Sequence, residues 1–119
     1  MPTQIISNKS AEHYKWGGPQ GIDCDGWHLV KTPELSIIEE LMPPGTSEAR
    51  HSHLHARQFF FVLEGELTLE VEHQNFVLQA GKGLEISPGQ RHQAINGCAE
   101  SVRMLVTSQP PSHGDKIMA

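Results

Sequence analysis

The sequence is poor in the residue types that mark several classes of protein. Its 119 residues contain two cysteines, Cys24 and Cys98, in no paired motif, so we expect free thiols rather than a disulfide framework. Nine lysines and arginines against 14 acidic residues leave no basic surface for nucleic acid. No apolar stretch approaches the roughly 18 residues of a membrane span, and the first residues lack the long apolar segment that is typical of a secretory signal. The sequence therefore predicts a cytoplasmic protein without a nucleic-acid or membrane partner.

Segments with helical periodicity are also missing, whereas 11 glycines and 8 prolines separate many short apolar runs. Residues 66–73 alternate between apolar and polar, which is typical of a strand with one face in a core. Residues 59–63 are uniformly apolar, as in a strand that is buried on both faces. The predicted strands cover residues 27–32, 35–42, 58–64, 66–73, 76–78, 84–86, 91–96 and 102–107. This pattern predicts an all-β protein with an N-terminal arm (1–25), a barrel (26–108) and an extended C-terminal tail (109–119).

Histidine is the abundant exception, with eight residues in all. His51 and His53 form an H-x-H pair whose side chains share one face of a strand, and His92 follows a Pro-Gly turn on a candidate neighbouring strand. Gln58 opens an apolar strand and offers an amide oxygen. Three imidazoles and an oxygen suit a borderline divalent ion. His55 has the same parity and is an alternative fourth ligand, although we expect it to face solvent.

The spacing of these residues resembles two signatures of the cupin family. The first family signature reads G-x5-H-x-H-x(3,4)-E-x6-G, and this chain has Gly45-x5-His51-x-His53-x4-Gln58-x6-Gly65. The second half of the other signature is matched by Gly89-x2-His92-x3-Asn96. The resemblance implies a jelly-roll β-barrel (double-stranded β-helix) that holds one divalent metal ion, without distinguishing Fe, Mn, Zn and Ni. It also implies a homodimer.

Gln58 stands where the family usually has Glu, so a metal held by three histidines and Gln58 would keep its full charge and pull more strongly on a substrate oxygen. The family includes dioxygenases, isomerases, lyases, storage proteins and sensors, so the resemblance does not fix a reaction. Our first hypothesis is a metal-dependent enzyme acting on a small organic molecule, by dioxygenase-like or isomerase/lyase-like chemistry. One alternative is a non-catalytic cupin that binds or senses a metabolite. Another is a barrel that the metal only braces.

Strand parity also assigns roles to residues near the expected site. Phe60 shares parity with Gln58 and should line the pocket, and Glu39 or Glu40 offers a general base from a facing strand. Three aromatic residues fit either the core or the pocket wall: Tyr14, Trp16 and Trp27. Expected to point away from the metal or to lie on the surface are Arg57, Arg91, His13, His28, His73 and His113.

Overall fold

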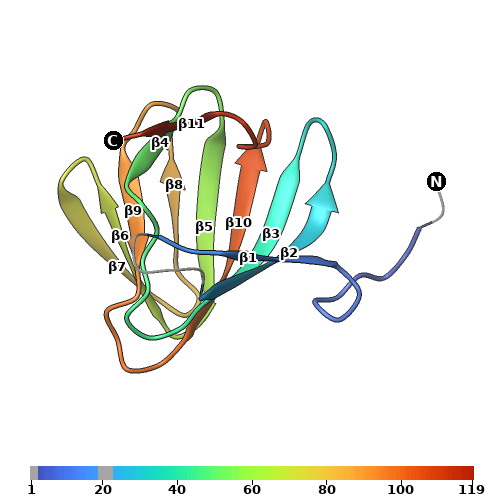
Figure 1. The fold of residues 1–119 in the computed structure, drawn as a ribbon, viewed down its shortest axis with the longest axis horizontal. Coiled ribbons are helices and arrows are strands. Elements are labelled where there is room, and N and C mark those ends of the chain that lie inside the picture. The colour runs from blue at the N-terminus through green and yellow to red at the C-terminus, as the bar shows by residue number, and fades with distance from the viewer. Residues whose placement is uncertain (1–2, 19–22) are drawn as a thin grey trace.

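Two antiparallel sheets pack against each other to form the body of the molecule (Figure 1). The computed structural model describes residues 3–18 and 23–119. Residues 1–2 and 19–22, which belong to the predicted arm, lie outside the described residues. The described part contains eleven strands and no helix, so no helix in it could cross a membrane. This arrangement confirms the predicted all-β jelly-roll fold.

The first sheet has six strands in the order β1-β2-β3-β10-β5-β8. Its members are β1 (Glu12–Trp16), β2 (Cys24–Lys31), β3 (Ser36–Met42), β5 (Arg57–Glu64), β8 (Gly83–Ile86) and β10 (Val102–Gln109). The second sheet has five strands in the order β11-β4-β9-β6-β7. Its members are β4 (His51–His53), β6 (Glu66–Val71), β7 (Gln74–Gln79), β9 (His92–Ile95) and β11 (Lys116–Met118).

The turn between β6 and β7 lies at residues 72–73, within the strand that was predicted over residues 66–73. Glu72 and His73 form the turn with φ of 47° and 71°, and Val71 pairs with Gln74. Two-residue hairpin turns favour positive φ at both central residues because that geometry matches the twist of the strands. The alternation of apolar and polar residues therefore extends two residues beyond the end of the strand, into the turn.

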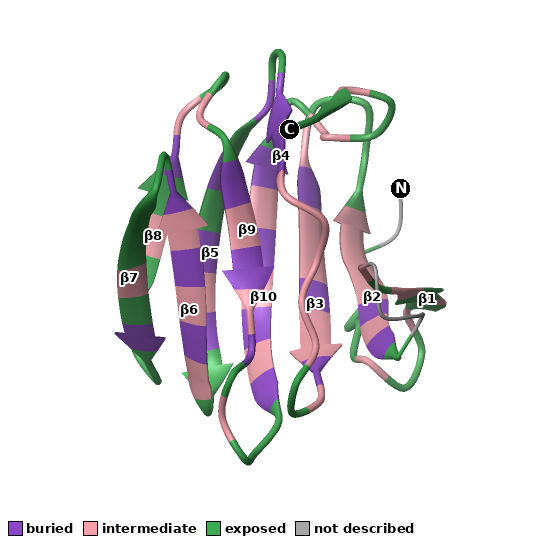
Figure 2. Cartoon of the chain, turned by 60° about the vertical axis from the view of Figure 1, so that its left-hand side comes forward, coloured by how far each residue is buried: buried purple, intermediate pink, exposed green. Residues whose placement is uncertain are grey.

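Strand β5 is buried on one face only, so the prediction that residues 59–63 are buried on both faces is wrong. Phe60 and Val62 face the interior, whereas Phe59 and Leu63 are 44% and 42% exposed. The reason is that the outer face of the six-stranded sheet is not covered by the described chain. Inward and outward residues alternate on β6, β9 and β10 in the same way, as the buried bands in Figure 2 show.

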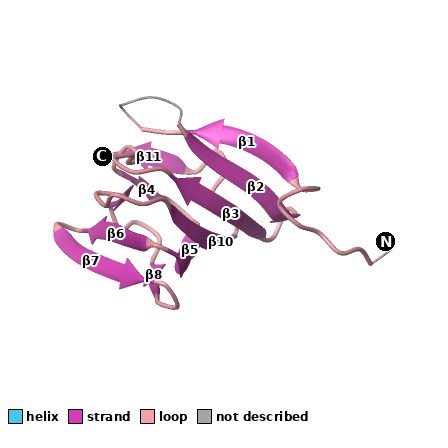
Figure 3. Ribbon diagram, turned by 90° about the horizontal axis from the view of Figure 1, so that it is seen from below, coloured by secondary structure: helices cyan, strands magenta, loops and turns pink. Residues whose placement is uncertain are grey.

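Both segments that the sequence analysis placed outside the barrel contribute a strand. β1 pairs with β2 at one edge of the six-stranded sheet (Figure 3). β11 pairs with β4 through Lys116 and His53, Ile117 and Ser52, and Met118 and His51. The sequence analysis did not identify β11. The division of the chain at residues 26 and 108 stays a prediction.

Candidate metal centre

Two neighbouring strands bring the three predicted histidines together. β4 carries His51 and His53, β9 carries His92, and the two strands pair directly at His51 and His92. One potential ligand atom from each residue lies within 4.8 Å of the others. The side chains are only 3%, 4% and 0% exposed, respectively. The strand parity of His51 and His53 and the predicted neighbouring strand of His92 are therefore matched by the convergence of the three side chains inside the barrel.

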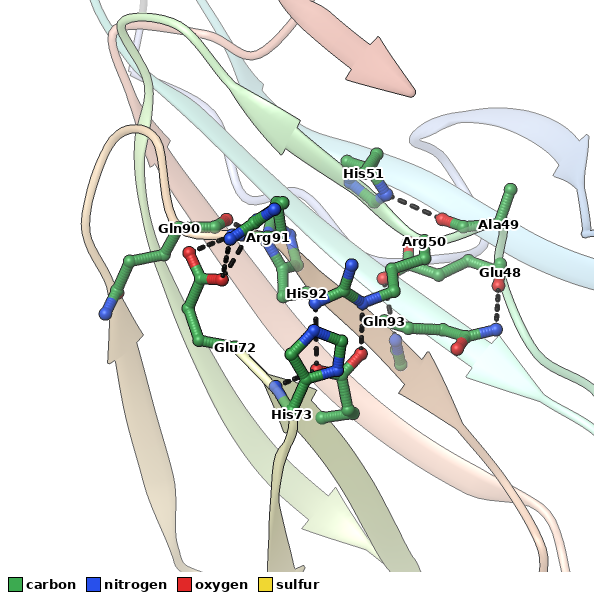
Figure 4. Close-up of polar contacts among 12 residues, drawn as sticks. Glu48, Ala49, Arg50, His51, Glu72, His73, Gln90, Arg91, His92 and Gln93 are labelled. Atoms are coloured by element: carbon green, nitrogen blue, oxygen red, sulfur yellow. Dashed lines mark hydrogen bonds and ion pairs between the residues drawn. The ribbon is translucent and has the colours of Figure 1, made fainter. Parts of the chain in front are cut away.

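Backbone carbonyls set the protonation of two of these rings. His51 Nδ1 donates to the carbonyl of Ala49 at 2.7 Å, and His92 Nδ1 donates to the carbonyl of Gln90 at 3.0 Å (Figure 4). Since a carbonyl only accepts, each neutral ring keeps its lone pair on Nε2. Such an outer hydrogen bond is the usual way to orient a metal-binding imidazole.

Several buried polar atoms at this site have no hydrogen-bond partner, among them His53 Nδ1, His92 Nε2 and Gln58 Oε1. The Gln58 amide donates to Ser108 Oγ at 3.0 Å, which leaves its oxygen as the free group. A buried polar atom without a partner is costly, and imidazole nitrogens and an amide oxygen are atoms that a cation can partner. The donor set therefore fits a divalent metal. His55 is exposed in the turn before β5, as expected.

Burial keeps the three rings neutral. It lowers the pKa of His51 to about 3 and the pKa of His53 to about 4, and it also lowers the pKa of His92. Desolvation disfavours a charged imidazolium, and neighbouring positive charge adds to the effect. Neutral imidazole is the form that binds metal, so protons compete weakly for this site.

His51 and His53 line a cavity of about 530 Å³. Phe60 lines it as predicted, and Tyr14 and Trp16 form part of its wall. Trp27 instead lies under the Arg103 guanidinium, 5.7 Å from the ring centre. The other lining residues are Glu12, His28, Lys31, Ile38, Glu40, Glu48, His51, His53, Gln58, Val106, Ser108, Ser112, His113 and Lys116.

The prediction that His28 is a surface residue is wrong. It is half-buried against Tyr14, with ring centres 4.8 Å apart, and its buried Nδ1 has no partner. His113 is exposed as expected, yet it also lines the cavity. His28 lies within β2 and His113 in the turn before β11, so a side chain that is partly solvent-accessible can still line the cavity.

Two carboxyl groups share the cavity with the histidines. Burial raises the pKa of Glu40 to about 8 and the pKa of Glu48 to about 7. Of the two acidic residues predicted on β3, Glu40 therefore faces the cavity, whereas Glu39 forms an ion pair with Arg103. Glu48 was not predicted. It lies in the irregular segment between β3 and β4, where strand parity gives no signal.

The two arginines that flank the predicted ligands bind acidic residues elsewhere, as expected from parity. Arg57 contacts Glu85 at 2.6 Å, and Arg91 contacts Glu72 at 2.9 Å. Figure 4 shows Arg91 and Glu72 beside the β9 strand that carries the metal-site histidine. Neither arginine lines the cavity.

A comparison with protein families decides the family of this fold. A family model described as a cupin domain matches residues 38–108, which include all three histidines and Gln58. The chain is a cupin. Its matched region begins in β3 and ends in β10, so β1, β2 and β11 lie wholly outside the region that the family model matches.

Among relatives of this cupin, the uncharacterised protein MJ1618 of Methanocaldococcus jannaschii is 26% identical over 89 residues, which are 74% of this chain and 71% of MJ1618. Polyketide synthase CurC of Streptomyces cyaneus is 33% identical over 70 residues, 59% of this chain and 46% of CurC. The solved structure of the polyketide cyclase RemF from Streptomyces resistomycificus superposes with a TM-score of 0.85 and 16% identity. That likeness covers 99% of this chain and 86% of RemF and shows the fold alone.

Proposed function

We propose that this cupin is a metal-dependent enzyme acting on a small organic molecule, with the ion held by His51, His53, His92 and Gln58. The observation that carries the proposal is the convergence of three buried, neutral imidazoles, two of which, His51 and His53, line a cavity. A divalent ion bound there would supply a Lewis acid for a carbonyl or hydroxyl oxygen of the substrate. Because Gln58 is neutral, the ligand set leaves the charge of the ion undiminished.

The neighbouring carboxyl groups favour proton transfer at carbon as the reaction type. Glu40 and Glu48, with pKa values of about 8 and 7, both exchange protons readily near neutral pH. A general base with such a pKa suits removal of a proton next to a carbonyl group. We therefore favour enolisation of a compound in which one methylene group separates two carbonyl groups, rather than oxygenase chemistry.

The names of two similar proteins agree with this reaction class. CurC is described as a polyketide synthase and RemF as a polyketide cyclase, and polyketide chains carry alternating carbonyl groups. Phe60, Trp16 and Ile38 supply an apolar wall on which the carbon skeleton of such a compound could pack. Cyclisation of a chain with several carbonyl groups is accordingly the specific reaction that we propose.

The first test combines metal analysis with a proton-exchange assay. Protein purified without added metal should contain close to one divalent ion per chain. In D₂O, the metal-loaded protein should accelerate exchange of the methylene protons of acetoacetate, followed by proton NMR. Glu40→Gln or Glu48→Gln should slow this exchange, whereas Glu85→Gln, on the outer face, should not. Binding without faster exchange would favour the alternative of a non-catalytic metabolite-binding cupin.

We also propose that the protein forms a homodimer through the outer face of β5. Phe59 and Leu63 are exposed there, and Phe59 stacks on Phe61 with ring centres 6.3 Å apart. Large apolar side chains gathered on one face of a sheet are typical of an interaction surface. A second barrel packed on this face would bury both residues.

A further inference from the structure

The C-terminal segment forms one wall of the cavity. We name residues 110–118 the C-terminal strap, which contributes Ser112, His113 and Lys116 to the lining. The strap begins directly after β10, and its strand β11 lies alongside β4 (Figure 1). The strap lies beyond the residues matched by the family model. It is therefore a feature of this chain that the family assignment does not explain.

Asp115 ties the strap to the turn that follows the H-x-H pair. Its carboxylate accepts hydrogen bonds from the backbone N–H groups of Leu54 and His55, at 3.1 Å and 2.9 Å, and from that of Ala56 at 2.8 Å. Three such bonds to one carboxylate are strong because the acceptor is charged. The position of the strap is therefore coupled to the strand that carries two of the metal-site histidines.

This anchoring places the exposed residue Lys116 beside the strand that carries His53. Lys116 is paired with His53 across the β4–β11 ladder, and directly opposed residues of antiparallel strands project from the same face. Lys116 accordingly lines the same cavity as His53. Burial is the largest influence on the pKa of Glu40, Glu48 and His53, and the charge of Lys116 acts to lower all three.

Lys116 differs from the other lysine of the cavity in having no acidic contact. Lys31 Nζ lies 3.2 Å from Glu12 Oε1. Within residues 3–18 and 23–119, no ion pair or side-chain hydrogen bond involves Lys116 Nζ. An ammonium group that faces a cavity without a contacting carboxylate is available to an anionic ligand.

We propose that Lys116 binds a carboxylate group of the ligand, so that the ligand carries both an anionic carboxylate and uncharged oxygen atoms for the histidine centre. The cavity also contains Glu12, Glu40 and Glu48, which disfavour a doubly charged phosphate more than a singly charged carboxylate. This inference rests on the proposed function and narrows its substrate to keto acids. Lys116 is then a specificity-determining residue that the C-terminal strap supplies.

The test compares two compounds of similar size, acetoacetate and acetylacetone, which differ in having a carboxylate or a methyl ketone at one end. Binding to the Co²⁺-loaded protein is measured by isothermal titration calorimetry. Lys116→Gln should weaken acetoacetate binding about 10-fold, the range of one charge-assisted hydrogen bond, and change acetylacetone binding by less than about 2-fold. Lys116→Arg should restore most of the lost affinity. Lys82→Gln, at an exposed turn, is the matched control and should leave both affinities unchanged.

The outcomes separate this inference from the proposed function. If wild type and Lys116→Gln hold cobalt and bind acetoacetate equally, the role of Lys116 is refuted while the metal site stands. An equal loss of affinity for both compounds would also refute it, because the effect of Lys116 would then not depend on the carboxylate of the ligand. If the wild-type protein holds no cobalt or binds neither compound, the proposed function fails first and the inference fails with it.

Discussion

The two ends of the barrel interior are built by the same strands but have opposite chemistry. On the paired strands β5 and β10, Gln58 lies opposite Ser108 at one end, and Val62 lies opposite Met104 toward the other. We call these the polar end, which includes the three histidines, and the apolar end, where the core residues gather. All four named side chains are buried. Strand alternation therefore determines which residues face inward, and position along the strand determines whether an inward-facing residue belongs to the polar or the apolar end.

The difference between the ends lies in their contribution to stability. The apolar end removes hydrocarbon from water, which stabilises the fold by about 25 cal/mol per Å². The polar end buries imidazole and carboxyl groups whose pKa values shift against their charged forms. Such shifts mean that burial of the charged form opposes folding. A polar end of this kind persists because the rest of the barrel supplies the stability.

The largest expected effect is on stability at the apolar end. Leu67, on β6, is 0% exposed, and Leu67→Ala should lower the free energy of unfolding by about 2–5 kcal/mol because it removes packed methyl groups and leaves a cavity. Urea denaturation of the metal-free protein measures this change. At low urea, the affinity of the folded variant for metal should stay near that of the parent. A loss of metal affinity in proportion to stability would show that the two ends are not independent.

The next expected effect is on metal binding at the polar end. His51→Ala or His92→Ala should each lower metal affinity by more than about 100-fold, beyond the range of outer-shell substitutions, because each removes one of three imidazoles. Metal analysis and cobalt titration measure the effect. His73→Ala is the control, since His73 is exposed in the β6–β7 turn. Loss of metal from the His73 variant to the same degree would disprove the assignment.

The polar end should also make the metal-free protein sensitive to acid. The pKa of His51 is lowered to about 3 and that of His53 to about 4, whereas an unfolded histidine has a pKa near 6.5. Below pH 6.5 the unfolded chain binds protons at these histidines that the folded chain does not, so the histidine contribution to stability should fall from about pH 6.5 toward pH 4, against an opposite contribution from Glu40 and Glu48, whose pKa values are raised. His51→Ala should show a shallower decline in urea unfolding measured across this range. An identical slope would mean that His51 is not neutral in the folded protein.

A smaller effect is expected from the difference between the two faces of β5. Phe60 faces the cavity and Phe59 faces outward, so Phe59→Asp should abolish self-association with little change in the fold. Sedimentation should give twice the chain mass of 13.2 kDa for the parent and 13.2 kDa for the variant. A parent that sediments as a single chain at micromolar concentration would refute the proposed homodimer.

The sequence predicted the placement of side chains well on regular strands, where strand parity applies, and poorly in irregular segments. Parity grouped His51 with His53 and separated Phe60 from Phe59, because side chains on a strand alternate strictly, whereas His92 was added by its place after the Pro-Gly turn and by the cupin signature. It could not place Glu48, whose segment is irregular. It also missed Lys116, because a three-residue strand after a proline-rich stretch carries no periodic signal, and its partner strand lies more than 60 residues earlier. Uniformly apolar residues on β5 misled the prediction, since composition does not reveal what covers an outer face.

The finest test of the polar end concerns Gln58, the position at which the chain departs from the cupin signature. Its Oε1 is buried without a partner, while its amide nitrogen donates to Ser108. If Oε1 binds the metal, Gln58→Glu adds a negative charge beside the cation, so Coulomb attraction should raise metal affinity by about 10-fold or more. The added charge also weakens the pull of the ion on a substrate oxygen, so exchange of acetoacetate protons should slow. Gln58→Ala should lower affinity. Equal metal affinities for the parent and both variants would remove Gln58 from the site and leave a centre of three histidines.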